Sequence, residues 1–245
     1  MIDWSIIAGS LPDFLAGLKV TLGLLAISLA TGLLLSVPLA VARVSSNPWV
    51  SRPVWLYTYV IRGTPLLVQL FIVYYGFAQI DFVRHSALWD LFKNAWFCAW
   101  FAFALNTTAY TTEIIAGALK ATPHGEIEAA RSVGMSSFSL YARILLPSAL
   151  RRALPQYGNE AVGMMHATAI ASTVTLVDLT RVARDVYANH LVTVEAFGTV
   201  AIFYFVLTFA LVGLFKVAEH YGLRHLRAQT ERSTVAISGA EMKTK

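Results

Sequence analysis

The chain has 245 residues, of which 57% are hydrophobic and 13% are charged, and its mean hydropathy is +0.61. Soluble domains carry about 25% charged residues, so this composition excludes an ordinary water-soluble globule. The net charge is +5, yet no basic stripe interleaved with aromatic residues occurs, and we therefore expect no nucleic-acid binding. The single cysteine, Cys98, can build neither a disulfide framework nor a paired-thiol metal site.

Five segments lack Asp, Glu, Lys and Arg and reach or approach the ~20 residues that a helix needs to cross a bilayer. They are residues 20–42, 63–80, 94–112, 161–177 and 196–215. Lipid offers the backbone no hydrogen-bond partner, and the alternation of a barrel strand is missing, so we expect helices. The first segment follows acidic residues and no cleavage site, which argues against a removable signal peptide.

Lys and Arg counts predict the orientation of these segments. With the N-terminus outside, and with Lys19 and Arg62 at the segment ends left uncounted, the inner side receives thirteen Lys and Arg and the outer side four. Cytoplasmic loops carry the excess of Lys and Arg, so the distribution favours N-out, C-in. The predicted fold class is thus an all-α, polytopic membrane protein with five transmembrane helices. Residues 221–245 form a basic cytoplasmic tail, which we expect to contact anionic lipid.

The second segment contains the sequence Arg62-Gly63-Thr64-Pro65. Residues 54–80, if helical throughout, would be ~40 Å long, so this helix must tilt, kink at Pro65 or begin as an interfacial piece. Arg62 either snorkels to the inner headgroups or faces the bundle interior at the break. Glu113, in turn, either reaches the inner interface or pairs with Arg62 to hold a gate shut. The predicted gate or kink residues are Arg62, Gly63, Thr64, Pro65, Gln69 and Glu113.

Residues 120–158, between the third and fourth segments, are far longer than the about two to eight residues that antiparallel helices need. Thr122 and Pro123 are expected as the N-cap and first position of a short helix, and Gly134 fits the left-handed position after its end. Ser136 or Ser137 can cap a second helix that Pro147 ends. The segment therefore predicts a helix, a turn and a helix beneath the membrane.

Two such short helices are marginal alone and cannot enclose a core, so something must cover them. Ala129 and Ala130 leave room for another protein's backbone, and Glu128 offers a carboxylate to a partner's Arg. This pattern favours partner docking over the alternative, an amphipathic pair lying on the lipid surface.

The fourth segment is the least apolar of the five. Its predicted substrate-pathway residues are Asn159, Glu160, His166, Thr168, Ser172 and Asp178. Ionisable residues at membrane depth tend to face the bundle interior or a watery cavity, although His and hydroxyl side chains also join helices by hydrogen bonds. No two histidines lie three or four residues apart, and no nucleophile elbow or Asp-rich metal run occurs. We therefore assign no catalytic and no metal residue.

The residues of the long loop carry a resemblance to a known family. Glu128-Ala129-Ala130, then Gly134 after three intervening residues and Ile144-Leu145-Leu146-Pro147 after nine more, resembles the EAA signature of the membrane subunits of binding-protein-dependent ABC importers. Similarity to the polar amino-acid branch, of the histidine, arginine, glutamine and octopine type, extends over Arg62–Tyr75, Asn106–Gly117 and Asn159–Asp178.

The resemblance implies a type I importer transmembrane domain over residues 14–220, with residues 120–158 as the loop that couples to an ATPase subunit. The coupling residues would be Glu128, Ala129, Ala130, Gly134, Ile144 and Pro147. This chain has no glycine followed by lysine and thus no P-loop, so ATP and Mg would bind the separate ATPase and no cofactor binds here.

The other implied partners are a second permease chain, identical or a paralogue, and a periplasmic substrate-binding protein. The implied function is alternating-access import of a polar, basic amino acid or derivative (arginine, histidine or octopine-like) across the bacterial inner membrane. The alternative is a secondary transporter or channel that works without an ATPase. Such transporters usually show repeated halves, and five segments do not divide into equal repeats. An intramembrane enzyme is disfavoured because acid, base and metal residues do not cluster.

Overall fold

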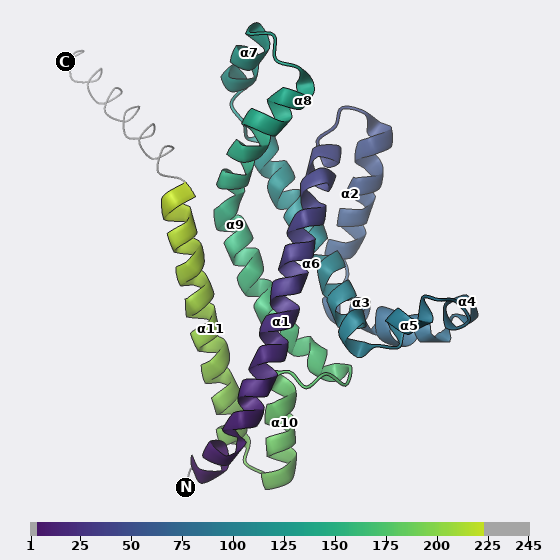
Figure 1. The fold of residues 1–245 in the computed structure, drawn as a ribbon, viewed down its shortest axis with the longest axis vertical. Coiled ribbons are helices and arrows are strands. Elements are labelled where there is room, and N and C mark those ends of the chain that lie inside the picture. The colour runs from purple at the N-terminus through teal and green to yellow at the C-terminus, as the bar shows by residue number, and fades with distance from the viewer. Residues whose placement is uncertain (1–3, 223–245) are drawn as a thin grey trace, which may run out of the picture.

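The computed structural model describes residues 4–222, which fold into helices and contain no strand within that range (Figure 1). The helices are α1 (Trp4–Arg43), α2 (Pro48–Arg62), α3 (Leu66–Phe71), α4 (Asp81–Arg84), α5 (Trp89–Phe92), α6 (Ala95–Lys120), α7 (His124–Ser132), α8 (Ser137–Leu140), α9 (Leu146–Ala167), α10 (Leu179–His190) and α11 (Thr193–Gly222). Figure 1 shows α1, α6, α9 and α11 as a bundle, with α7 and α8 at one end and α10 at the other.

Two helices of the described chain, α1 and α11, are long and apolar enough to cross a membrane by themselves. The pair formed by α2 and residues 66–79 passes the same test, but it is bent by 100° at the break. The helices α6 and α9 are shorter and carry more polar groups, and they pack inside the bundle where other helices cover them. Five spans and the N-out, C-in orientation stay predictions.

Small residues line the face of α1 that packs on its neighbours. The buried ones are Ser10, Gly17, Thr21, Ser28, Gly32, Ser36 and Ala40. A Cβ atom added at Gly32 would lie 2.4 Å from Cγ2 of Thr107 on α6, and one added at Gly17 would lie 3.0 Å from the Asp178 backbone. Small residues let helix backbones approach closely where the solvent is lipid, so this seam fixes α1 against the bundle.

Of the three alternatives for the second segment, the structure contains the break near Pro65. Gly63 ends α2 and Pro65 is the N-cap of α3, and the chain turns by 100° between them. Gln69 replaces backbone hydrogen bonds that are lost at the break. Its Nε2 atom donates to the Ile61 carbonyl at 2.7 Å and to the Thr64 carbonyl at 3.1 Å. The break is therefore a built feature with its polar groups satisfied.

The fourth predicted segment is not one α-helix. α9 ends at Ala167, a 3₁₀ turn follows over Thr168–Thr173, and the chain is then irregular up to Asp178. Thr175 has φ 65°, a left-handed conformation that is rare for a β-branched residue. The side chains on either side of Ala167 therefore do not follow one continuous α-helical face.

Two details of the predicted loop are also wrong. Pro147 does not end a helix but lies in the first turn of α9, directly after a π-helical turn over Tyr141–Leu145. Proline is tolerated there because the wider turn and the helix start do not need its missing N–H. The second loop helix therefore continues into α9. The N-cap of α7 is Pro123, while Thr122 is buried.

The amphipathic helix α10 was not predicted. Asp178 caps it by accepting a hydrogen bond from the Arg181 N–H at 3.0 Å. Its buried residues Leu179, Val182, Ala183 and Val186 form a core with Phe14 of α1 and with Ala196 and Val200 of α11. The predicted basic tail lies outside the described residues beyond Gly222.

Candidate functional site: a polar groove and a terminal hairpin

An open groove of ≈450 Å³ lies where α2, α3, α6 and α9 meet. Its lining residues are Arg62, Gly63, Thr64, Pro65, Leu66, Asn106, Tyr110, Glu160, Gly163, Met164 and Ala167. The groove thus joins the predicted break of the second segment to Glu160 of the predicted substrate pathway. These two regions are about one hundred residues apart in the chain.

The groove contains one cationic and one anionic side chain that form no salt bridge with each other. The Arg62 guanidinium lies 5.2 Å from the centre of the Tyr110 ring, a cation–π geometry, and the Tyr110 hydroxyl donates to the Arg62 carbonyl at 3.5 Å. Asn106 donates from Nδ2 to Oε1 of Gln69 at 3.1 Å. Arg62 is therefore held beside the groove by α6, which favours the interior position over simple snorkelling.

Glu113 has a different partner from the one predicted. Arg43 Nε donates to Glu113 Oε1 at 2.7 Å, and Thr58 Oγ1 donates to the same oxygen at 2.7 Å. The Arg43 and Glu113 side chains are only 18% and 21% exposed. In this structure Glu113 therefore pairs with Arg43, and the alternative of a Glu113–Arg62 gate contact stays a prediction. The observed cluster ties α1, α2 and α6 together, and Arg43 lies 70 positions from Glu113, so spacing could not reveal it.

Of the six predicted pathway residues, only Glu160 lines the groove. His166 shares a hydrogen bond with Thr208 of α11 at 3.1 Å. Thr168 and Ser172 are buried and donate to carbonyls of their own segment, as helix-joining or back-bonding hydroxyls do. Asn159 is exposed outside the groove, and Asp178 is a helix cap.

Six of the groove residues were not predicted from the sequence: Leu66, Asn106, Tyr110, Gly163, Met164 and Ala167. Asn106 and Tyr110 are four residues apart, the spacing of one helical face, and this signal could have placed them together.

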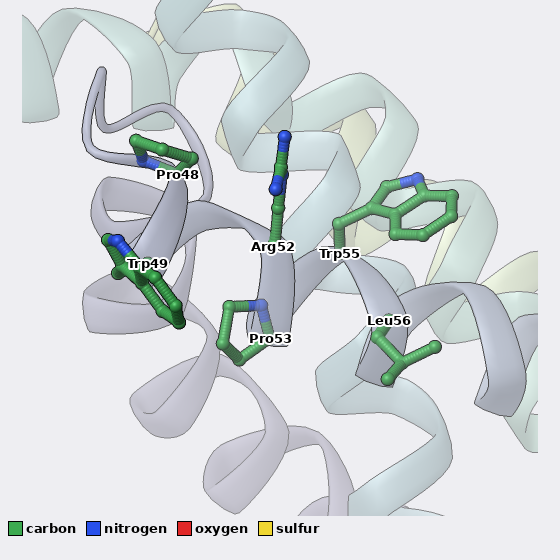
Figure 2. Close-up of a pocket in the computed structure, with 6 residues that line it drawn as sticks. All are labelled: Pro48, Trp49, Arg52, Pro53, Trp55 and Leu56. Carbon is green, nitrogen blue, oxygen red and sulfur yellow. The ribbon is translucent and has the colours of Figure 1, made fainter.

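A second and larger groove, of ≈590 Å³, is less suited to a polar solute. All its lining residues come from α2, and Figure 2 shows them as Pro48, Trp49, Arg52, Pro53, Trp55 and Leu56. Arg52 supplies its only charge, and the rest of the surface is apolar. Exposed Trp and Arg side chains of this kind are typical of a membrane interface.

The hairpin of α7 and α8 forms the end of the bundle (Figure 1). Gly134 has φ 77°, which confirms its predicted left-handed position, and Ser136 Oγ accepts the Ser139 N–H as predicted. Glu128 and Ala129 are exposed, whereas Ala130 is only 4% exposed and packs into this chain's own core. The small size of Ala130 thus serves internal packing.

The hairpin also carries large apolar side chains with no cover from the rest of the described chain. Val133 is 76% exposed and Phe138 is 82% exposed. Two further residues of the predicted motif are half-buried: Ile144 in the π-helical turn and Pro147 in the first turn of α9. Exposed apolar groups of this kind occur at surfaces that contact another protein or a membrane.

A helical bundle with spans that suit lipid, a polar groove and an uncovered terminal hairpin defines a membrane transport subunit. The chain belongs to the family of binding-protein-dependent transport system inner membrane components, whose model matches residues 32–220. Membership makes it a multi-pass inner-membrane permease of the ABC importer type. Members of this family work with an ATPase and a substrate-binding protein.

Curated relatives match over nearly the whole chain. The histidine/lysine/arginine/ornithine transport system permease protein HisM of Salmonella typhimurium is 47% identical over 214 residues, 87% of this chain and 91% of that protein. The nopaline transport system permease protein NocM of Agrobacterium fabrum is 44% identical, over 93% of this chain and 95% of that protein. The octopine transport system permease protein OccM of Rhizobium radiobacter is 42% identical over 84% of each.

Solved structures agree with this assignment. A chain of an amino acid ABC transporter crystallised with histidines aligns with TM-score 0.80 and 32% identity, over 90% of this chain and 99% of that one. An inward-facing MetNI methionine ABC transporter aligns with TM-score 0.70 at 16% identity, over 85% of this chain and 95% of that one, and shows the fold alone.

Proposed function

We propose that this permease carries a basic amino acid or an opine-like derivative through the groove between Arg62 and Glu160. The observation that carries the proposal is the pair of opposite charges that line one groove without a salt bridge between them. A carboxylate can accept hydrogen bonds from a substrate's ammonium or guanidinium group, and an arginine can bind its carboxylate. The names of the relatives, which transport histidine, lysine, arginine, ornithine, nopaline or octopine, support the same substrate class.

The proposed mechanism is alternating access driven by an ATPase on the cytoplasmic side. The hairpin would dock in that subunit through Glu128, Ala129, Val133 and Phe138, and its displacement would switch the bundle between two packed states. ATP and Mg would bind the ATPase and not this chain. A second permease, an identical chain or a paralogue, would close the open side of the groove, and a periplasmic binding protein would deliver substrate from outside.

The substrate proposal is tested by uptake into vesicles that contain the complete importer. Glu160→Gln should raise the KM for a cationic amino acid about tenfold, equivalent to ~1.4 kcal/mol, and change neutral amino-acid uptake little. Asp90→Asn is the matched control, because its carboxylate is exposed and lies outside the groove. An equal loss for cationic and neutral substrates would contradict a charge-reading role for Glu160.

The same vesicles separate the importer from the alternative of a secondary transporter. Uptake should require the ATPase, ATP and the binding protein together. A purified permease that concentrates the solute alone would refute the ATP-driven mechanism.

A further inference from the structure

Arg152, near the cytoplasmic end of α9 in the predicted topology, joins three parts of the chain with one guanidinium group. Its Nη2 atom donates to the Ala118 carbonyl at 3.2 Å and to Thr122 Oγ1 at 2.6 Å. Its Nη1 atom donates to Ser148 Oγ, on the same helix, at 2.8 Å. These bonds link α9 to the end of α6 and to the segment that leads into α7.

One of these hydrogen bonds satisfies a backbone carbonyl at the end of α6. The last carbonyls of a helix lack partners within the helix. After α6, the N–H groups of Ala121 and Thr122 donate to the Gly117 and Leu119 carbonyls and pass over Ala118. Arg152 satisfies the carbonyl of Ala118 and also places a cation at the negative end of the helix dipole.

Thr122, the other acceptor, is only 5% exposed and immediately precedes the N-cap of α7. Its hydroxyl is therefore a fixed attachment point for the hairpin. The sequence pattern suggested an N-cap role for Thr122, but the structure shows its side chain bonded to α9.

Apolar packing reinforces the same junction. Ala130 of α7, Leu119 of α6, and Ala149 and Ala153 of α9 are buried in one core cluster. The two α9 alanines flank Arg152, so packing and hydrogen bonds act at one place. Glu160 lies eight residues further along α9, about 12 Å along the helix axis.

From these contacts we propose that Arg152 is a positioning residue for energy coupling. It holds the hairpin to α9, so that movement of α7 displaces the part of α9 that carries Glu160. The inference rests on the proposed docking of the hairpin in an ATPase. Without the guanidinium, movement of α7 displaces α9 less, because only the continuous chain from α8 and the apolar cluster then join them.

The test measures ATP hydrolysis and substrate uptake by the complete importer in vesicles. Arg152→Gln should lower the substrate molecules moved per ATP about tenfold, within the usual range of coupling between sites, while hydrolysis continues. Thr122→Val, which keeps the side-chain shape and removes the acceptor, should change the ratio in the same direction by a smaller factor. Arg152→Lys should restore part of it, because an ammonium keeps the charge but not the fork of donors.

Lys216→Gln is the matched control, since it removes one exposed cation at the same predicted side of the membrane from α11. The double variant Arg152→Gln with Thr122→Val should lower the number of substrate molecules moved per ATP no further than Arg152→Gln alone, because both changes remove the same contact. An unchanged ratio in Thr122→Val and in every Arg152 variant that assembles would overturn the inference, as would an equal fall in the control.

Failure of the proposed function gives a different result. A wild-type permease that transports without the ATPase removes the docking model itself. A wild-type importer that needs the ATPase, combined with unaltered ratios in the variants, removes only the role of Arg152.

Discussion

Replacing Arg43 tests the contribution of the cluster that Arg43, Thr58 and Glu113 form. Arg43→Met keeps the length of the side chain and leaves the Glu113 carboxylate with Thr58 as its remaining hydrogen-bond donor. Exposed ion pairs contribute about 0.2 to 1 kcal/mol, whereas removing one partner of a buried pair costs about 3 to 5 kcal/mol. Both side chains are about one-fifth exposed, so the cost should lie between these ranges, at about 2 to 3 kcal/mol.

The assay is the free energy of unfolding in mixed detergent micelles, measured for Arg43→Met, Glu113→Met and the double variant. The double variant should cost less than the sum of the single changes by about 1 to 2 kcal/mol, because the two side chains interact directly. A parallel cycle with Arg62→Met and Glu113→Met should show a much smaller coupling energy, since the Arg62 side chain packs on Tyr110. A larger coupling for Arg62 than for Arg43 would refute the reasoning and restore the pair predicted from sequence.

Three further predictions use matched variants. Gly32→Ala should lower the free energy of unfolding by about 1 to 3 kcal/mol, because the added Cβ would lie 2.4 Å from a threonine methyl on α6. Gly23→Ala, where an added Cβ meets no atom within 4 Å, should change the free energy of unfolding by less than about 0.5 kcal/mol. Gly134→Ala should strain the hairpin by about 1 to 2 kcal/mol and reduce stimulated ATP hydrolysis, whereas Gly125→Ala should do neither. Equal rates of stimulated ATP hydrolysis in the two variants would argue that the left-handed turn is not required. Glu128→Lys should leave thermal stability unchanged and abolish stimulated hydrolysis, and normal stimulation would show that the exposed carboxylate makes no docking contact.

Local backbone chemistry explains which parts of the fold the sequence predicts. Pro65 lacks an N–H and Gly134 tolerates positive φ, so the kink and the hairpin turn follow from residue type alone. The end of α9 does not, because Thr168–Thr173 contain no proline or glycine that would signal a break, and the change to a 3₁₀ turn depends on packing against other elements. Pro147 was misread as a helix end because its tolerance depends on the π turn before it.

The residues of the candidate site also differ in whether the sequence alone could predict them. Arg62 and Glu160 were predicted because a charge at membrane depth needs a cavity or a partner, whichever helices surround it. The Arg43–Glu113 pair and the Arg152–Thr122 contact join residues 70 and 30 positions apart, and only the packing of helices brings them together. His166, polar and at membrane depth, met the same criterion as Glu160 but bonds α11 instead.

The most direct test of the account is a cross-link from the exposed tip of the hairpin. Phe138→Cys, on a background where buried Cys98 is replaced by Ala, should form a cross-link to the ATPase subunit in the assembled importer. Phe82→Cys, comparably exposed at 75% but on α4, should form none. The opposite result would be that the cysteine at position 138 forms no cross-link to the ATPase and reacts with a water-soluble thiol reagent in the working complex. That result would contradict docking of the hairpin in the ATPase.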